Sequence, residues 1–231
     1  MPAAATLEKT VNVEGLQKHY GDLEAVRGVT FDVAPGETFG FLGPNGAGKS
    51  TTISMLCTLI TPTGGRAQVA GCDVEQDPLG VRRRIGLVFQ DPTLDEYLTA
   101  YENLRFHAEL YRMPKERTAD RLKTVIEMVG LWHRRDDLVR TFSGGMKRRL
   151  EIARGFLHTP KILFLDEPTL GLDPQSRNQL WTHVKYLNQT EGVTVFLTTH
   201  YMDEADRVAQ RIAVIDHGKI VAQGTPAEIK Q

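Results

Sequence analysis

The chain has 231 residues, 41% hydrophobic and 25% charged, which fits one globular domain or a core with an inserted subdomain. Its 28 basic residues nearly balance its 29 acidic ones, which argues against a nucleic-acid partner. No apolar run approaches the ~18–20 residues of a membrane span, and MPAAATLEKT lacks the basic and apolar segments of a secretory signal. Cys57 and Cys72 suggest neither a disulfide framework nor a zinc site, and we expect Cys57 to be a core thiol. The composition predicts a soluble intracellular protein.

Antiparallel strands are predicted in the first forty residues, because apolar and polar residues alternate in VNVEGL and again in VTFDV. A short apolar run, TFGFLG, then leads into GPNGAGKS. The following KSTTISMLCTLI has the length and spacing of a helix, which we expect Pro62 and the pair Gly64 and Gly65 to end. Two further strands are predicted in RAQVAGCDV and RIGLVFQ, around a charged stretch with arginines at 82–84.

Residues 91–141 predict helices, because apolar residues recur there at intervals of three and four. From Lys161 onward strand-like runs return. KILFLDE and VTVFLTTH are continuously apolar, as strands buried on both faces of a parallel sheet are. IAVIDHGKIVAQG predicts a hairpin with residues 216–218 at its turn. The pattern as a whole indicates an α/β core with a helical insertion.

The stretch GPNGAGKS satisfies the pattern G-x-x-x-x-G-K-[ST], with a strand before it and a helix after it. Glycines let the backbone curl around a phosphate and turn N–H groups inward, and the start of the helix adds its positive dipole end. We expect Lys49 to neutralise the β- and γ-phosphates and the Ser50 hydroxyl to bind Mg²⁺. The residues predicted to bind a nucleoside triphosphate are Gly43, Pro44, Asn45, Gly46, Ala47, Gly48, Lys49, Ser50 and Thr51.

Three further strands end in polar residues. Asp166 closes the apolar run ILFLD and is expected beside the phosphate loop, where it would hold Mg²⁺ through its water shell. Because adjacent residues of a strand point opposite ways, Glu167 is expected to point away from Asp166 and to act as the general base for the attacking water; a solvated strand-end carboxylate is the alternative. His200 closes VTVFLTTH, and we favour a γ-phosphate contact over a purely structural role. Gln90 closes RIGLVFQ and is a candidate to sense the metal or the water.

This ordered set of motifs resembles the ATP-binding subunits of ATP-binding-cassette (ABC) transporters, over almost the whole chain from Tyr20 to the closing hairpin. The resemblance implies that Tyr20 stacks on adenine and that Gln90 belongs to the loop linking nucleotide state to a membrane partner. It implies that Glu167 is the catalytic glutamate and His200 the switch histidine, and it matches Asp173 to the D-loop. The cofactors implied are ATP and Mg²⁺.

The fold expected for such a protein is α/β, a P-loop NTPase core with a mostly parallel sheet and flanking helices. An N-terminal antiparallel β subdomain and an inserted helical subdomain complete it. We expect one ABC domain over residues 1–231, with the core and β subdomain at 1–90 and 156–231. The helical subdomain, at 91–155, then carries the signature motif.

The stretch FSGGM, residues 142–146, occupies the signature position, which in the family caps the γ-phosphate held by the phosphate loop of a facing subunit. Helix chemistry agrees, because Ser143 is an N-cap residue, while Gly144 and Gly145 let backbone N–H groups approach an anion. An apolar stripe is predicted behind them, at Met146, Leu150, Ala153 and Leu157. The basic residues beside it are expected to form mostly a solvated face, with one or two attracting the nucleotide: Lys147, Arg148, Arg149 and Arg154.

Met146 stands where the common signature LSGGQ has a glutamine, whose hydrogen bonds methionine cannot replace. SGGM followed by KRRL, together with EPTLGLDP and THYMDEADR, resembles the branch that serves drug, antibiotic and lipid exporters of the daunorubicin-resistance type. We therefore interpret Met146 as a mark of that branch.

The leading hypothesis is the ATPase motor of a membrane exporter. Two copies, or one copy and a related subunit, would sandwich two ATP–Mg²⁺ and dock on separately encoded transmembrane permease subunits, with no nucleic acid involved. The chain would then lie on the cytoplasmic side of the cell membrane as a peripheral protein. The docking surface is expected near Gln90 and the helical insertion, as an apolar patch.

Two other classes use the same loop. A non-transport ABC ATPase of the translation or DNA-repair type would show tandem cassettes or a long coiled coil between the two nucleotide motifs, and the sequence has neither. A GTPase would show an N/T-K-x-D element, which is missing, and a small-molecule kinase would leave the signature and His200 unexplained. The exporter hypothesis accounts for every motif.

Overall fold

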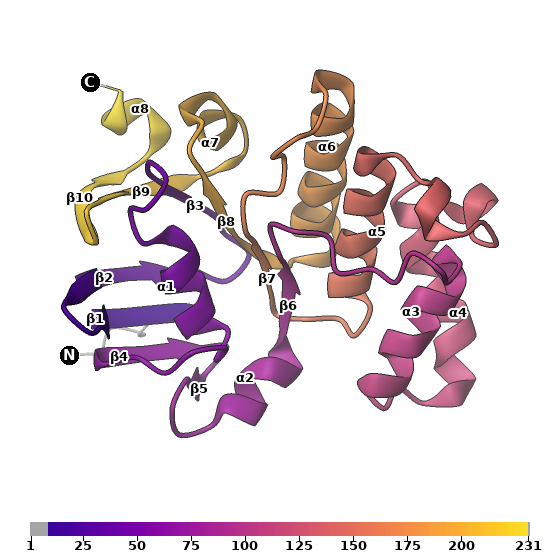
Figure 1. Ribbon diagram of the computed structural model, residues 1–231, viewed down its shortest axis with the longest axis horizontal. Helices are drawn as coiled ribbons and strands as arrows, with labels where there is room; N and C mark the ends of the chain where they lie inside the picture. The colour runs from indigo at the N-terminus through magenta and orange to yellow at the C-terminus, as the bar shows by residue number, and fades with distance from the viewer. Residues whose placement is uncertain (1–8, 231) are drawn as a thin grey trace, which may run out of the picture.

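A computed structural model describes residues 9–230, so the prediction about a secretory signal falls almost wholly outside the described residues. Two sheets and a group of helices make up this part of the chain, with the sheets towards both termini and the helices α3 and α4 at the far side (Figure 1). No helix within residues 9–230 combines the length and the apolar character needed to cross a membrane.

The first sheet is antiparallel, with the strand order β2-β1-β4-β5. The predicted strand RAQVAGCDV is in fact a hairpin, because Ala70 and Gly71 take left-handed φ angles of 51° and 79° and reverse the chain. Such a pair of residues forms the tight turn that matches the twist of two antiparallel strands. The strands are β1 (Val11–Tyr20), β2 (Leu23–Val33), β4 (Gly64–Val69) and β5 (Cys72–Asp73).

The helix after the phosphate loop, α1 (Lys49–Leu56), is shorter than predicted. It ends because Thr58 adopts a left-handed φ of 59°, with its N–H bonded to the Met55 carbonyl at 3.1 Å. The prediction that Gly64 and Gly65 end this helix was therefore wrong, since both glycines lie in β4. The arginines at 82–84 close a further short helix, α2 (Pro78–Arg84).

The second sheet has six strands in the order β10-β9-β3-β8-β7-β6. All pairs are parallel except the β9–β10 hairpin, whose turn residues His217 and Gly218 have φ angles of 44° and 78°. The predicted hairpin is therefore present. The strands are β3 (Thr38–Leu42), β6 (Ile85–Val88), β7 (Ile162–Leu165), β8 (Thr194–Thr199), β9 (Arg211–Asp216) and β10 (Lys219–Gly224).

Both faces of this sheet are buried, which explains its continuously apolar strands. In β7, Ile162 and Phe164 pack into a core shared with α1 and the antiparallel sheet. Leu163 and Leu165 point to the other face and pack into a core shared with the helices. Because neighbouring residues of a strand face opposite ways, a strand between two cores is buried on both faces, and β7 is apolar at every position. The prediction that VTVFLTTH is continuously apolar holds only in part, since β8 also buries threonines at 194, 198 and 199.

Helices cover the second face of the parallel sheet, with α5 and α6 side by side next to it and α3 and α4 beyond them (Figure 1). They are α3 (Ala100–Leu110), α4 (Lys115–Met128), α5 (Gly144–Phe156) and α6 (Pro174–Glu191), with the short α7 (Met202–Val208) and α8 (Pro226–Ile229) nearer the C-terminus. The predicted α/β fold, with its antiparallel β subdomain and its parallel sheet with flanking helices, is confirmed.

Candidate active site

The carboxyl ends of the parallel strands β3, β6, β7 and β8 meet at one edge of the sheet. The phosphate loop follows β3, Gln90 follows β6, the pair Asp166 and Glu167 follows β7, and His200 follows β8. Ligands of open α/β sheets bind at this edge. Residues far apart in the sequence, from Gly43 to His200, therefore converge there.

The loop between β3 and α1 requires glycine at two positions. A Cβ on Gly43 would lie 2.2 Å from the Ile215 carbonyl oxygen, and one on Gly48, whose φ is 105°, would lie 2.6 Å from that of Ala25. Gly48 caps α1 without any side-chain hydrogen bond, which leaves the first N–H groups of the helix open. Open N–H groups and the helix dipole are what a bound phosphate needs.

Lys49 is the cation of this loop and is buried, with 4% of its surface exposed. Its Nζ donates hydrogen bonds to the carbonyls of Gly43 and Pro44, at 2.8 and 3.0 Å. The same atom lies 3.1 Å from Glu167 Oε1. The ammonium group therefore lies between the backbone carbonyls of the phosphate loop and the carboxylate of the predicted general base.

Glu167 joins the loop to His200, because its Oε2 lies 3.2 Å from His200 Nδ1. The reason for its orientation differs from the one predicted. Strand β7 ends at Leu165, so the alternation of a strand does not reach Glu167; instead, Glu167 takes a left-handed φ of 43°. Its N–H donates to Thr198 Oγ1 at 2.9 Å, and that hydroxyl donates to Asp166 Oδ1 at 2.6 Å. The turn therefore separates the two neighbouring carboxylates.

Hydroxyl and carboxylate oxygens are the ligands that Mg²⁺ prefers, and the edge offers both. Ser50 is exposed in the first turn of α1. Asp166 is 8% exposed, and Thr198 occupies one of its carboxylate oxygens. Gln90 is exposed at the same edge. It follows β6 by two residues, and the last residue of β6, Val88, accepts a hydrogen bond from Asp166 N at 3.0 Å. These donors fit a magnesium ion.

The signature residues form a second group, at the start of α5. Ser143 caps the helix as predicted, accepting a hydrogen bond from Met146 N at 3.3 Å. A Cβ on Gly145 would lie 2.5 Å from Ser176 Oγ, so this glycine also permits close packing between α5 and α6. Asp173 caps α6 and accepts from Ser176 Oγ at 2.6 Å. That hydrogen bond, with those from backbone N–H groups, lowers the pKa of Asp173.

Two groups of predicted site residues thus emerge. Within residues 9–230, no hydrogen bond or ion pair joins Ser143, Gly144, Gly145 or Asp173 to Lys49, Glu167 or His200. Tyr20 lies apart from both at the end of β1, half-exposed, with Lys18 Nζ 5.2 Å from its ring centroid.

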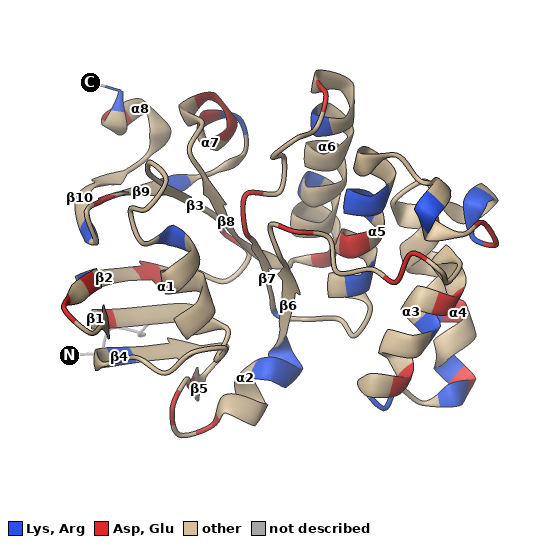
Figure 2. Ribbon diagram, viewed as in Figure 1, with Lys and Arg blue, Asp and Glu red and all other residues tan. Residues whose placement is uncertain are grey.

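The basic residues of α5 do not form the solvated face that the sequence predicts. Arg148 and Arg154 are each 6% exposed, and both lie close to the buried Glu151. Figure 2 shows basic and acidic positions next to one another along α5. Burial lowers the pKa of both arginines, while Glu151 acts in the opposite direction. The prediction was wrong because these guanidinium groups find acceptors inside the protein.

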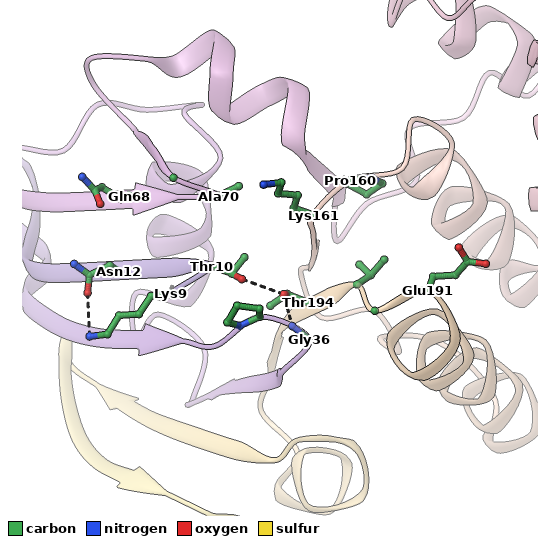
Figure 3. Close-up of a pocket in the computed structure, with 14 residues that line it drawn as sticks. Lys9, Thr10, Asn12, Gly36, Gln68, Ala70, Pro160, Lys161, Glu191 and Thr194 are labelled. Atoms are coloured by element: carbon green, nitrogen blue, oxygen red, sulfur yellow. Dashed lines mark hydrogen bonds between the residues drawn. The ribbon is translucent and has the colours of Figure 1, made fainter. Parts of the chain in front are cut away.

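A cavity of ≈690 Å³ lies at the other end of the sheet (Figure 3). Its walls include Lys161 and Thr194, which stand at the amino ends of β7 and β8, and Thr10, whose hydroxyl lies 3.3 Å from that of Thr194. The cavity is therefore separate from the edge that holds the phosphate loop.

Comparison with known proteins agrees with this site. Residues 26–170 match the family described as ABC transporter. The daunorubicin/doxorubicin resistance ATP-binding protein DrrA of Streptomyces peucetius is 50% identical over 96% of this chain and 67% of its own length. The linearmycin resistance ATP-binding protein LnrL of Bacillus subtilis is 43% identical over 95% of this chain and 70% of its own length.

Solved structures agree as well. The structure of cbiO1 from Clostridium perfringens, part of the ABC transporter complex cbiONQ, superposes with a TM-score of 0.89 at 29% identity, over 96% of this chain and 91% of that one. A dimeric post-hydrolysis state of an ATP-binding cassette bound to ADP and Pi superposes with a TM-score of 0.83 at 28% identity, over 94% and 98%.

The chain belongs to the ABC transporter family, as an ATP-binding domain. It is an ATPase, and the predicted resemblance to the drug-exporter branch of the daunorubicin-resistance type is confirmed.

Proposed function

We propose that this ATPase powers the export of a substrate through separately encoded transmembrane permease subunits, from the cytoplasmic face of the membrane. The observation that carries the chemistry is the contact of Glu167 with both Lys49 and His200 at the mouth of the phosphate loop. Export is supported by the relatives, which are named for daunorubicin and linearmycin resistance and for Nod factor export.

Lys49 and the open backbone N–H groups at the start of α1 bind the phosphates in this proposal. Glu167 accepts a proton from water as the water oxygen attacks the γ-phosphorus and the bond to ADP breaks. His200 holds the γ-phosphate and orients Glu167. Ser50, Asp166 and Gln90 would hold Mg²⁺, which neutralises phosphate charge.

Tyr20 supplies the stacking surface for adenine. Ser143, Gly144 and Gly145 of a second copy, or of a related subunit, cap the γ-phosphate, and Asp173 lies at the same interface. We assign the whole of 1–231 to one ABC domain, with 1–90 and 156–231 as core and β subdomain and 91–155 as helical subdomain. The open start of α5 behind the Ser143 cap supports the trans contact, since a glycine-rich helix N-terminus attracts anions.

We propose that the permease docks at a groove of ≈410 Å³. Its apolar wall includes Leu59, Phe89 and Tyr111, which are 50%, 37% and 41% exposed. Phe89 precedes Gln90, so a partner that contacts this wall touches the residue next to the proposed metal site. An exposed apolar groove bordering a catalytic loop suits a partner whose movement must follow hydrolysis.

The proposal is tested by the variants Lys49→Ala and Glu167→Gln, assayed for ATP affinity and for turnover. Lys49→Ala removes the buried cation and should lose ATP binding. Glu167→Gln keeps the loop intact and should bind ATP, with kcat lowered by roughly 10²–10⁴-fold, the usual contribution of a general base. Glu191→Gln, at the cavity on the opposite end of the sheet, is the matched control and should be unaffected. Near-normal turnover of Glu167→Gln would remove that residue from its assigned role.

A further inference from the structure

Arg148 lies beneath two of the loops that carry the site. Its Nε donates to the Pro168 carbonyl at 2.8 Å and its Nη2 to the Asp166 carbonyl at 3.0 Å. Its Nη1 donates to the Phe89 carbonyl. One guanidinium therefore holds the backbone on both sides of Glu167 and the backbone just before Gln90.

The backbone of Glu167 needs such support. A left-handed φ of 43° is unfavourable for a residue with a side chain and persists only where the surroundings fix it. The carbonyls that precede and follow Glu167 both accept from Arg148, while the Glu167 N–H is fixed by Thr198. Its carboxylate therefore projects towards Lys49 and His200 from a turn whose backbone is fixed by three hydrogen bonds.

The loop of Gln90 is held at its other end by the same cluster. Glu151, which is fully buried, accepts from Arg148 Nη1 at 3.0 Å and from Thr93 N at 2.8 Å. Arg154 Nη2 donates to Thr93 Oγ1 at 2.6 Å and its Nη1 to the Thr93 carbonyl at 3.1 Å. Phe89 and Thr93 are thus both anchored to α5, with Gln90 between them.

The neighbouring Arg149 is an arginine of α5 that does not bond to the loops of the site. It donates to the Val129 carbonyl, at 2.9 Å, within the helical region. None of its hydrogen bonds among the described residues reaches the loops after β6 or β7. Arg149 belongs to the same helix and is partly buried, which makes it a matched control for Arg148.

We propose that Arg148 is a positioning residue for ATP hydrolysis, which sets Glu167 and Gln90 by holding their neighbouring carbonyls. The proposal rests on the role proposed above for Glu167. A planar guanidinium with five donors can bond several carbonyls in fixed directions, which the ammonium group of lysine cannot do. Arg148→Lys therefore keeps the positive charge but loses the planar guanidinium group that donates to several carbonyls at once.

The test compares Arg148→Lys, Glu151→Gln and the control Arg149→Lys, each assayed for ATP Kd, kcat and thermal unfolding. Misplacing a catalytic group by about 1 Å costs on the order of 10²-fold in rate, so we expect kcat of Arg148→Lys to fall by at least about 10-fold. Its ATP Kd should stay within about twofold, because none of the hydrogen bonds of Arg148 among the described residues reaches the phosphate loop. Glu151→Gln should lower kcat in the same way, and Arg149→Lys should leave kcat and Kd unchanged.

Two results would overturn the proposal. One is turnover of Arg148→Lys and Glu151→Gln close to that of the wild type. The other is a loss of ATP affinity that parallels the loss of kcat, which is what general disruption of the fold produces. If Arg148→Lys does not fold, Glu151→Gln decides alone. Glu167→Gln, measured alongside, separates the two proposals: its normal turnover refutes the proposed function, whereas its inactivity beside a normal Arg148→Lys refutes only the positioning role.

Discussion

Gly145 offers a direct test of how α5 packs on α6. Replacing it with alanine would put a Cβ 2.5 Å from Ser176 Oγ and 2.7 Å from Ser176 Cβ, distances at which one helix must shift. Overpacking of this kind costs about 1–3 kcal/mol. Gly144 is the natural control, because a Cβ there would meet nothing closer than Leu172 Cδ2 at 3.9 Å. Neither glycine has a positive φ, so alanine is compatible with the backbone at both positions.

Alanine also favours a helix over glycine by up to about 1 kcal/mol, and this gain applies to both positions. It cancels when the two variants are compared, so Gly145→Ala should be less stable than Gly144→Ala by the overpacking cost of about 1–3 kcal/mol. A domain of this size shifts in Tm by about 2–4 °C per kcal/mol. Urea unfolding of both variants without nucleotide measures the difference. Equal stability would refute the close approach of α5 and Ser176.

Three further predictions concern other parts of the molecule. Ser143→Arg should abolish ATP-dependent dimerisation and turnover while lowering Tm by only about 2–4 °C, because the side chain is exposed and the lost helix cap is worth about 1 kcal/mol; normal dimerisation on a sizing column would contradict this. Phe196→Ala should cost about 3–5 kcal/mol in urea unfolding, because its ring packs against four others at 5.4–5.9 Å; a cost under about 1 kcal/mol would contradict the shared core. Burial, with Arg154, lowers the pKa of His107 from 6.5 to about 4. The unfolded state therefore takes up this proton first, so stability should fall as pH drops from 6.5 to 4, and His107→Gln should flatten that part of the profile; an unchanged profile would contradict it.

Features fixed by neighbouring residues were predictable from the sequence. The phosphate loop is marked by one contiguous motif, although the carbonyls that exclude a Cβ at Gly43 and Gly48 belong to distant residues. The strand β7, which lies between two cores, is apolar at every position. The hairpin turn at His217 and Gly218 is another such feature, since residues that tolerate a left-handed φ mark it.

Features that depend on distant acceptors were not predictable. Arg148 has the sequence pattern of a solvated face, yet its acceptors Pro168 and Phe89 lie 20 and 59 positions away. The spacing of Arg148, Glu151 and Arg154 at three-residue intervals was the available signal, because it places opposite charges on one helix face. The early end of α1 has a similar cause: the left-handed turn at Thr58 gives no compositional warning.

The measurement that tests the central proposal most directly is the solution mass of Glu167→Gln, with and without ATP–Mg²⁺, by light scattering on a sizing column. The variant should run as a monomer of about 25.8 kDa without nucleotide and at about twice that mass with ATP, because the nucleotide is held between two copies and is not hydrolysed. A control with Ser143→Arg added should remain monomeric. A Glu167→Gln protein that binds ATP and stays monomeric would contradict the sandwich between the phosphate loop and the signature of a second copy.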